Sequence, residues 1–260
     1  MTTRRSKSAI PTSFWNLRSL RAGDSRVSPT GEVNWSAMTT PKRFVDLSHT
    51  VIHGQVTYPG LPAPLICDYL SREAARGRYA EGVTFQIGKI EMVANTGTYV
   101  DSPFHRYEGG NDLSALSLER LADLETLVVR VDSGVQEITV ERLENLDVRG
   151  KAVLFATGWD RHFGGEQYAQ GHPFVGESAA RWLAERAPAM VGIDSVNIDD
   201  TRDGRRPAHS LLLARDIAIC EHMSNVGALP DSGARFFAVP PKVRGFGTFP
   251  VRAFAIVDSL

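Results

Sequence analysis

The densest group of residues that could do chemistry lies at positions 95–105, N-T-G-T-Y-V-D-S-P-F-H. It places Asp101 and His105 four residues apart, with Pro103 between them. A carboxylate and a neutral imidazole are common ligands of Zn²⁺ and Mn²⁺, and a proline stiffens the chain that presents them. The same residues also fit a short capped helix that starts at Pro103. This segment alone leaves both interpretations open.

A second group of residues favours the metal site. Pro207-Ala208-His209 opens a predicted helical turn, and an apolar run at 217–220 then ends on Glu221. A carboxylate attached to an apolar run is costly to bury unless it is paired or bound to a metal. Two acids and two histidines that converge would satisfy a catalytic divalent cation.

Other catalytic classes lack their sequence signals. The chain has no G-x-x-x-x-G-K-[ST] loop, no G-x-G-x-x-G after a strand and no G-x-S-x-G elbow, which argues against nucleotide binding and serine-hydrolase chemistry. Cys67 and Cys220 lie in apolar runs outside any C-x-x-C, so we expect both to be structural. Two cysteines in 260 residues indicate a reducing, cytoplasmic compartment.

Composition narrows the class of partner. With 29 Lys and Arg against 30 Asp and Glu, the net charge is −1, which gives no support for nucleic-acid binding. No apolar run approaches the roughly 18–20 residues that span a bilayer. We therefore expect a small-molecule substrate, with neither nucleic acid nor membrane as partner.

The near-neutral total hides an uneven distribution of charge. Residues 1–43 hold eight basic and only two acidic residues and are rich in Ser and Thr. We expect them to form a flexible basic N-terminal arm, with an organellar transit peptide as the alternative. Residues 44–260 are expected to form one folded domain.

The elements that must position the candidate residues follow from hydrophobic patterning. Strands are expected at 43–48, 83–93 (half-buried), 126–132, 152–157, 189–196, 217–220, 236–240 and 253–257. Helices are expected at 71–81, 113–124 and 177–186, with a helical turn at 209–214. Strands outnumber helices, which predicts an α/β fold built as a single mixed-sheet domain.

The body of the chain resembles the metal-dependent cyclase/hydrolase family that includes bacterial kynurenine formamidase (arylformamidase) and isatin hydrolase. That family carries H-x-G-T-H-x-D-x-P-x-H, then a distal P-x-H that Glu follows twelve residues later. Here the corresponding residues are 95–105, 207–209 and Glu221. Shorter similar stretches at 46–49, 58–60, 157–159, 192–195 and 250–252 extend the resemblance over roughly 45–258.

The resemblance implies a swivelling β/β/α fold, a hydrolase acting on C–N bonds other than peptide bonds, and a homodimer or homotetramer. It also implies that Asp101, His209 and Glu221 are metal ligands and that His105 is the catalytic acid/base. The chain departs from the family at Asn95 and Tyr99, which replace two histidine ligands. Amide oxygen and neutral phenol are poor substitutes for imidazole, so we expect one divalent ion, Zn or Mn.

The expected function is metal-dependent hydrolysis of a small cyclic or aryl amide, or of a lactone, with His105 moving the proton. Tyr99 is expected to donate a hydrogen bond to the oxyanion. Tyr58, Trp159 and Asn95 are expected to bind the substrate. Arg106 and Arg252 are weaker candidates for attracting a substrate carboxylate.

Two alternatives from other functional classes stay open. The chain could be a catalytically degraded family member that binds a small ligand or serves in an assembly. It could also be a biosynthetic cyclase or dehydratase on the same fold, since such reactions use the same acid/base histidine beside a Lewis acid.

Overall fold

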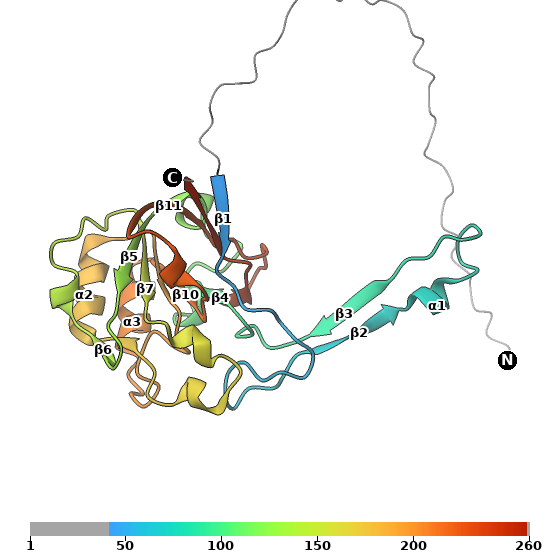
Figure 1. The fold of residues 1–260 in the computed structure, drawn as a ribbon, viewed down its shortest axis with the longest axis horizontal. Coiled ribbons are helices and arrows are strands. Elements are labelled where there is room, and N and C mark those ends of the chain that lie inside the picture. The colour runs from blue at the N-terminus through green and yellow to red at the C-terminus, as the bar shows by residue number, and fades with distance from the viewer. Residues whose placement is uncertain (1–41, 259–260) are drawn as a thin grey trace, which may run out of the picture. The chain divides into compact units, whose positions relative to one another are not determined.

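A nine-stranded mixed sheet organises the molecule (Figure 1). The computed structural model describes residues 42–258, so the predicted basic arm lies outside the described residues except for its last two. The strand order is β1-β13-β11-β5-β7-β9-β10-β4-β12. These strands are β1 (Lys42–Asp46), β4 (Tyr99–Asp101), β5 (Leu124–Arg130), β7 (Ala152–Ala156), β9 (Met190–Ile193), β10 (Ala218–Glu221), β11 (Ser232–Phe237), β12 (Thr248–Pro250) and β13 (Phe254–Asp258).

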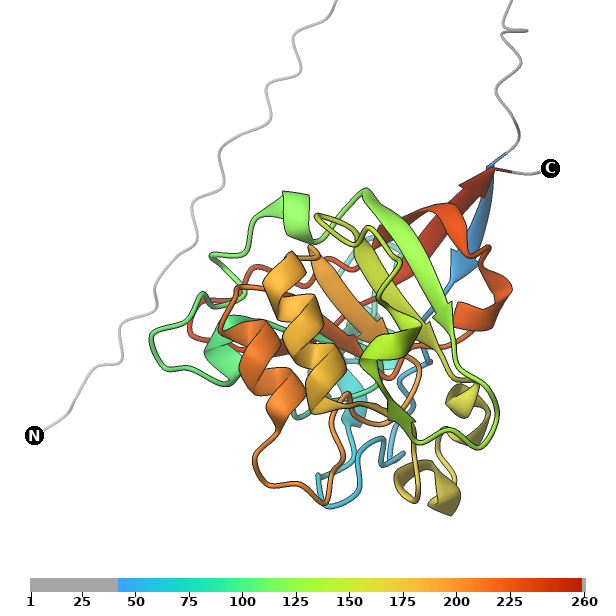
Figure 2. The same cartoon turned by 90° about the vertical axis from the view of Figure 1, so that its left-hand side faces the viewer.

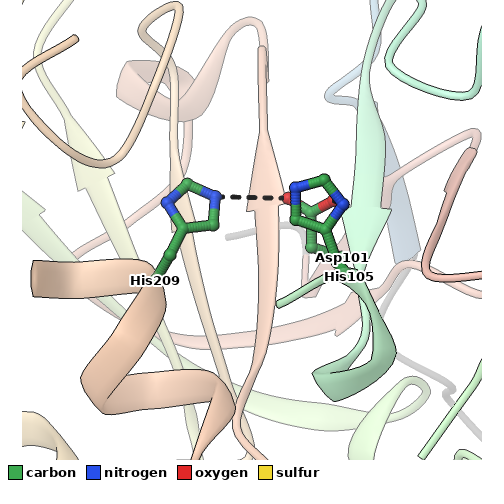
Figure 3. A group of neighbouring side chains, drawn as sticks. All are labelled: Asp101, His105 and His209. Atoms are coloured by element: carbon green, nitrogen blue, oxygen red, sulfur yellow. Dashed lines mark ion pairs between the residues drawn. The ribbon is translucent and has the colours of Figure 1, made fainter. Parts of the chain in front are cut away.

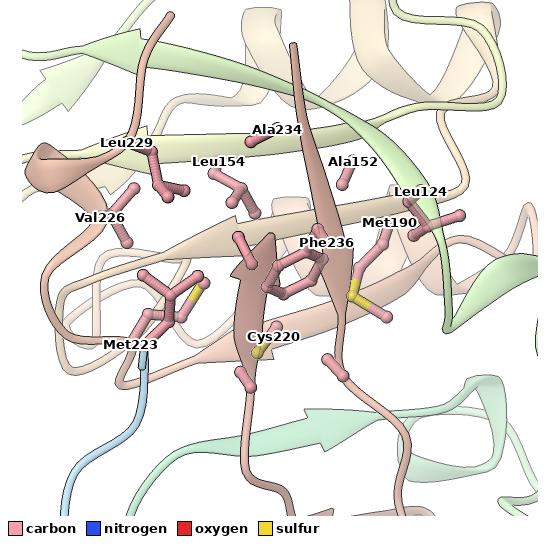
Figure 4. Packing of buried hydrophobic residues seen from close by; sticks show 14 of the residues in the cluster. Leu124, Ala152, Leu154, Met190, Cys220, Met223, Val226, Leu229, Ala234 and Phe236 are labelled. Atoms are coloured by element: carbon pink, nitrogen blue, oxygen red, sulfur yellow. The ribbon is translucent and has the colours of Figure 1, made fainter. Parts of the chain in front are cut away.

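The centre of the sheet is parallel and buried on both faces. Strands β5, β7, β9 and β10 pair in parallel, and every residue of β7 is buried. Successive side chains of β7 enter opposite cores, because residues alternate across a strand. Leu154 joins the core that Phe236 and Met190 fill (Figure 4). Its neighbour Phe155 joins the other core.

Two helices cover one face of the sheet (Figure 2). They are α2 (Glu177–Arg186) and α3 (Pro207–Leu213), whose Leu183 and Leu212 are fully buried in the same core as Phe155. This matches the single mixed α/β domain that the sequence predicts. Among the described residues, no helix is long and apolar enough to cross a membrane.

The site residues come from the antiparallel side of this sheet. Strand β4 lies between β10 and β12, and all three run side by side. Tyr99 is opposite Glu221, and Asp101 is opposite Thr248. Directly opposed residues share a face of the sheet, so this register brings four polar side chains together.

Two predicted helices are largely absent. The leucine-rich segment 113–124 forms only a 3₁₀ turn at Leu118–Arg120. Ser117 adopts an extended backbone (φ −76°, ψ 147°) immediately before this turn, which interrupts the run and prevents one continuous helix. The segment 71–81 holds only α1 (Arg72–Ala75), and Gly77 then turns the chain at φ 78°.

The predicted half-buried strand at 83–93 is present but exposed. It forms β3 (Ile87–Glu91), all of whose residues are exposed, because it pairs only with β2 (Leu65–Leu70). The two strands make a ribbon that projects from the sheet (Figure 1). Cys67 lies exposed on this ribbon and not in a core, whereas Cys220 is buried as expected.

The remaining elements are short. They are the paired strands β6 (Glu137–Ile138) and β8 (Phe174–Val175), and the 3₁₀ turns η1 (Pro103–His105), η3 (Val140–Arg142), η4 (Trp159–His162), η5 (Glu166–Ala169) and η6 (Val226–Ala228).

Candidate active site

Two fully buried carboxylates form the base of the site. The Asp101 Oδ1 atom accepts a hydrogen bond from the Thr248 hydroxyl, while Asp101 Oδ2 has no hydrogen-bond partner. Burial opposes ionisation of Asp101, but the charges of His105 and His209 outweigh it and lower the pKa of this carboxyl. A buried oxygen with no partner is rare in folded proteins, so Asp101 Oδ2 is placed to meet a cation.

Glu221 ends β10 and is held on both oxygens. Its Oε1 atom accepts from the Ile198 N–H at 2.6 Å, and its Oε2 atom accepts from the Tyr99 hydroxyl at 2.6 Å. Burial raises the pKa of Glu221 to about 7, against the opposing effect of the His209 charge. The single hydrogen of the Tyr99 hydroxyl is thus committed to Glu221. The predicted donation from Tyr99 to an oxyanion does not fit this arrangement, and Tyr99 instead anchors Glu221.

His209 is positioned by a residue that the sequence analysis missed. The Asp199 carboxylate accepts from the N–H groups of Ala208 and His209, which begin α3, and pairs with His209 Nδ1 at 2.7 Å. The other ring nitrogen, Nε2, lies 3.7 Å from both Asp101 Oδ2 and Glu221 Oε1. Burial alone would lower the pKa of His209, but the surrounding carboxylates raise it to about 10. The carboxylates around His209 Nε2 therefore favour a positive charge next to this atom.

His105 stands across from His209, with 5.8 Å between the ring centroids. Its Nδ1 atom lies 2.8 Å from the Thr248 hydroxyl oxygen. Because that hydroxyl donates to Asp101, its oxygen accepts from His105 Nδ1–H, which leaves Nε2 unprotonated in the neutral ring. The side chain is 35% exposed and can meet a substrate. The backbone of Gly247 packs against His105 so closely that an added Cβ would lie 2.5 Å from its Cα.

The donor atoms of Asp101, His105 and His209 all lie within 4.8 Å of one another (Figure 3). Carboxylate and imidazole donors suit Zn²⁺ or Mn²⁺. Together with the unpartnered Asp101 Oδ2, this donor set fits a divalent cation. The family resemblance implies Glu221 as a ligand and His105 as the acid/base, whereas this three-residue group contains His105 and not Glu221.

A pocket of about 280 Å³ opens above these groups. It contains most of the predicted substrate-binding residues and three that were not predicted. Its lining consists of Tyr58, Leu61, Asn95, Tyr99, His105, Arg106, Asn197, Arg206, His209 and Glu221.

Two predicted contributors lie elsewhere. The Trp159 indole N–H donates to the Tyr168 carbonyl, and Trp159 lines a different pocket. It follows the turn at Gly158, which the Asp194 carboxylate ties down through that residue's N–H. Arg252 pairs with Asp46 at 2.7 Å and does not line this pocket.

Asp199 and Thr248 carry weak sequence signals. Asp199 is one of two consecutive aspartates, and only the fold of the loop before Pro207 brings it to the start of α3. Thr248 meets Asp101 across 147 residues through the β4–β12 register. Neither relationship is visible in residue spacing.

Known proteins provide an independent comparison. The chain is 26% identical over 208 residues to the kynurenine formamidase of Erythrobacter litoralis, covering 80% of this chain and 91% of that protein. It is 24% identical over 217 residues to the kynurenine formamidase of a Bacillus cereus strain, covering 81% of this chain and 95% of that protein.

The fold is similar to solved structures of the same kind. Isatin hydrolase A from Labrenzia aggregata, bound to benzyl benzoate, superposes with a TM-score of 0.72 at 22% identity, covering 84% of this chain and 94% of that one. A structure described as a "Potential Metal-Dependent Hydrolase With Cyclase Activity" gives a TM-score of 0.69 at 24% identity and covers 85% and 100% of the two chains. The predicted fold class is confirmed.

The family itself is decided by a match to its sequence model. Residues 45–200, more than half of the chain, match the Cyclase model, described as "Putative cyclase". The expectation of a cyclase-family amide hydrolase agrees with this match and with both sets of relatives. This chain belongs to the cyclase family.

Proposed function

We propose that this chain is a metal-dependent hydrolase that cleaves the C–N bond of a small aryl or cyclic amide. One observation carries the proposal: the unpartnered Asp101 Oδ2 lies 3.7 Å from His209 Nε2, next to the pocket that His105 and His209 line. Kynurenine formamidases and isatin hydrolases among the relatives support the amide as the bond cleaved. A lactone is an alternative substrate of the same chemistry.

Asp101 and His209 would hold one divalent cation, Zn or Mn, with Glu221 as the third ligand. When bound, such a cation supplies Lewis-acid activation of water and of the amide carbonyl. Asp199 fixes the His209 tautomer from behind, as outer-sphere carboxylates do in many metal sites. Tyr99 keeps Glu221 oriented.

His105 is proposed to move the proton. Its Nε2 atom accepts a proton from the attacking water as oxygen adds to the amide carbon. It returns that proton to the nitrogen as the C–N bond breaks, which releases an amine and a carboxylic acid. Such acid/base catalysis typically contributes about 10²–10⁴ in rate. Thr248 is a positioning residue that orients the ring.

The alternative role for His105 is that of a ligand, because its donor atom belongs to the close group with Asp101 and His209. His105→Ala separates the two roles. As an acid/base, its loss should lower kcat by about 10² or more and leave the metal content unchanged. Loss of the metal in His105→Ala would make it a ligand. Thr248→Val is the comparison variant, since it keeps the His105 ring but removes the hydroxyl that accepts from His105 and donates to Asp101.

The proposed activity is tested with formanilide, isatin and an aryl lactone, each with Zn²⁺ or Mn²⁺ added. Turnover of at least one that disappears in His209→Ala supports the proposal. A metal-loaded protein that turns over none of them would favour the ligand-binding alternative. That alternative is based on Asn95 and Tyr99, which replace two histidine ligands of the family. Activity that appears only in Asn95→His/Tyr99→His would favour it further.

We also propose that the chain acts in the cytoplasm as a homodimer or homotetramer. The projecting ribbon supports assembly, because Leu65, Tyr69, Ile87 and Ile90 are all at least 45% exposed on it. A two-stranded ribbon is marginally stable alone, and clustered apolar exposure marks interaction surfaces. Light scattering after gel filtration should give a multiple of 28.5 kDa. The mass should fall to that of a monomer in Tyr69→Lys/Ile90→Lys.

A further inference from the structure

The proposed active-site pocket is acidic at its base and basic at its rim. Asp101 and Glu221 lie at the base, whereas two of the lining residues, Arg106 and Arg206, carry guanidinium groups. Within residues 42–258, neither arginine makes an ion pair with a carboxylate at 4.0 Å or less. The proposed cation would lie at the acidic base of the pocket. It does not explain the positive charge of the two arginines at the rim.

Arg206 differs from the arginines that precede it in the same loop. Arg202 pairs with Asp200 and Arg205 pairs with Asp203, each at 2.8 Å. Arg206 instead makes two long hydrogen bonds from Nη1, to Asn197 Oδ1 at 3.4 Å and to the Asp200 carbonyl at 3.3 Å. These contacts orient the guanidinium without neutralising it, and they leave Nε and Nη2 available for a carboxylate.

The backbone of Arg206 is also unusual. It adopts φ 49° and ψ 61°, the left-handed region, immediately before Pro207 at the start of α3. The left-handed conformation is strained for a non-glycine residue, and such residues concentrate at binding and catalytic sites. His209 follows three residues later on α3, and both side chains line the pocket. One short segment thus supplies a group at the base and a group at the rim.

Tyr58 completes the rim. It lines the same pocket as Arg206, close enough for the positive charge of Arg206 to act on its hydroxyl. Burial and the negative charge of Glu221 raise its pKa, so the phenol stays protonated and can donate a hydrogen bond. A guanidinium beside a neutral phenol is a suitable receptor for a carboxylate, because the planar fork binds two oxygens at once.

We propose that Arg206, assisted by Tyr58, binds a carboxylate of the substrate, and that the substrate class is therefore an aryl or cyclic amide that carries a carboxylate. The more exposed Arg106 adds a second positive charge that attracts the anion. The inference rests on the proposed amide hydrolysis, because it assigns the scissile bond to the base of the pocket and the anion to the rim. It makes Arg206 a specificity-determining residue.

The test compares formanilide with 2- and 3-formamidobenzoate, which add a carboxylate to the same aryl formamide. The wild-type protein should prefer a formamidobenzoate. Arg206→Gln should lower kcat/KM for that substrate by about 10- to 100-fold, mostly through KM. It should change formanilide turnover less than threefold. Glutamine avoids a β-branch at this left-handed position, and Arg206→Lys, which keeps the charge but loses the fork, should fall between the two.

Arg205→Gln is the matched control, because Arg205 is exposed and already paired with Asp203. It should leave the substrate preference unchanged. An equal effect of Arg206→Gln on both substrates, or a preference that Arg205→Gln abolishes as well, would overturn the proposal. Thermal melts of each variant show whether it is folded, and a variant that does not fold is replaced by Arg206→Lys.

Calorimetric binding of benzoate and benzamide, with and without a chelator, separates this inference from the proposed function. Benzoate binding that survives chelation and is lost in Arg206→Gln supports the anion site even if no amide is cleaved. Cleavage of all the amides with the same preference in Arg206→Gln as in the wild type leaves the hydrolase standing and refutes the anion site. Benzoate binding that disappears with the metal also refutes it.

Discussion

Asp199 should control the metal affinity of the site although it is not a ligand. Its carboxylate receives three hydrogen bonds, from the N–H of Ala208, the N–H of His209 and His209 Nδ1. Asp199→Asn keeps the size of the side chain but replaces one acceptor oxygen with an NH₂ group. If the amide keeps its oxygen toward Ala208, the NH₂ group faces His209 Nδ1 and forces that nitrogen to accept. The proton then moves to Nε2, where it blocks the cation.

The size of the effect follows from these contacts. Loss of an outer-sphere carboxylate typically weakens metal binding by about 10- to 100-fold, or about 1.4–2.7 kcal/mol. The variant also loses the bond from the His209 N–H at 3.0 Å and replaces the charge-assisted contact to His209 Nδ1 at 2.7 Å with a weaker neutral one. At about 1–2 kcal/mol for the lost bond and about 1 kcal/mol for the weakened one, the free energy of unfolding should fall by about 2–3 kcal/mol.

The assay is competition for Zn²⁺ against a fluorescent chelator, combined with urea unfolding of the metal-free protein. Asp203→Asn is the control, because that carboxylate pairs with the exposed Arg205 away from the pocket. Unchanged Zn²⁺ affinity in Asp199→Asn would refute the assigned tautomer and, with it, the assignment of His209 Nε2 as a ligand.

Other perturbations give equally direct results. Tyr99→Phe removes the 2.6 Å bond to Glu221 and should lower the free energy of unfolding by about 1.5–3 kcal/mol; a urea-measured loss under 0.5 kcal/mol would contradict this. Burial raises the pKa of Asp194 to about 6, so the folded state retains a proton that the unfolded chain releases above about pH 4. Stability should fall by up to about 3 kcal/mol as pH rises from 4 to 7, and Asp194→Asn should lack this component of the urea profile. In Gly247→Ala the new Cβ meets His105, so amidase kcat should drop at least tenfold while bound metal is retained; unchanged kcat would refute this close packing.

The proximity of Asp101, His105, His209 and Glu221 could be predicted because these residues occupy motifs of fixed spacing. Asp101 and His105 flank a proline, and Glu221 follows His209 by twelve residues. The buried strand at 152–156 could also be predicted from sequence, because an unbroken apolar run is typical of a parallel strand covered on both faces.

The parts that sequence could not predict depend on long-range contacts. Periodic leucines at 113–124 predict a helix, yet Leu113, Leu121 and Leu124 are buried from an irregular backbone that an extended Ser117 interrupts. The contact between Thr248 and Asp101 depends on strand register and not on local pattern. Trp159 resembled a pocket aromatic, but the loop after β7 directs it to a different pocket.

Metal stoichiometry tests the central claim most directly. After equilibration with Zn²⁺ or Mn²⁺ and removal of excess, elemental analysis of the wild-type protein should give one equivalent per chain. His209→Ala and Asp101→Ala should retain essentially none, while Asp203→Asn keeps the full equivalent. Two equivalents in the wild type, or undiminished metal in His209→Ala and Asp101→Ala, would contradict a single-cation site on these residues.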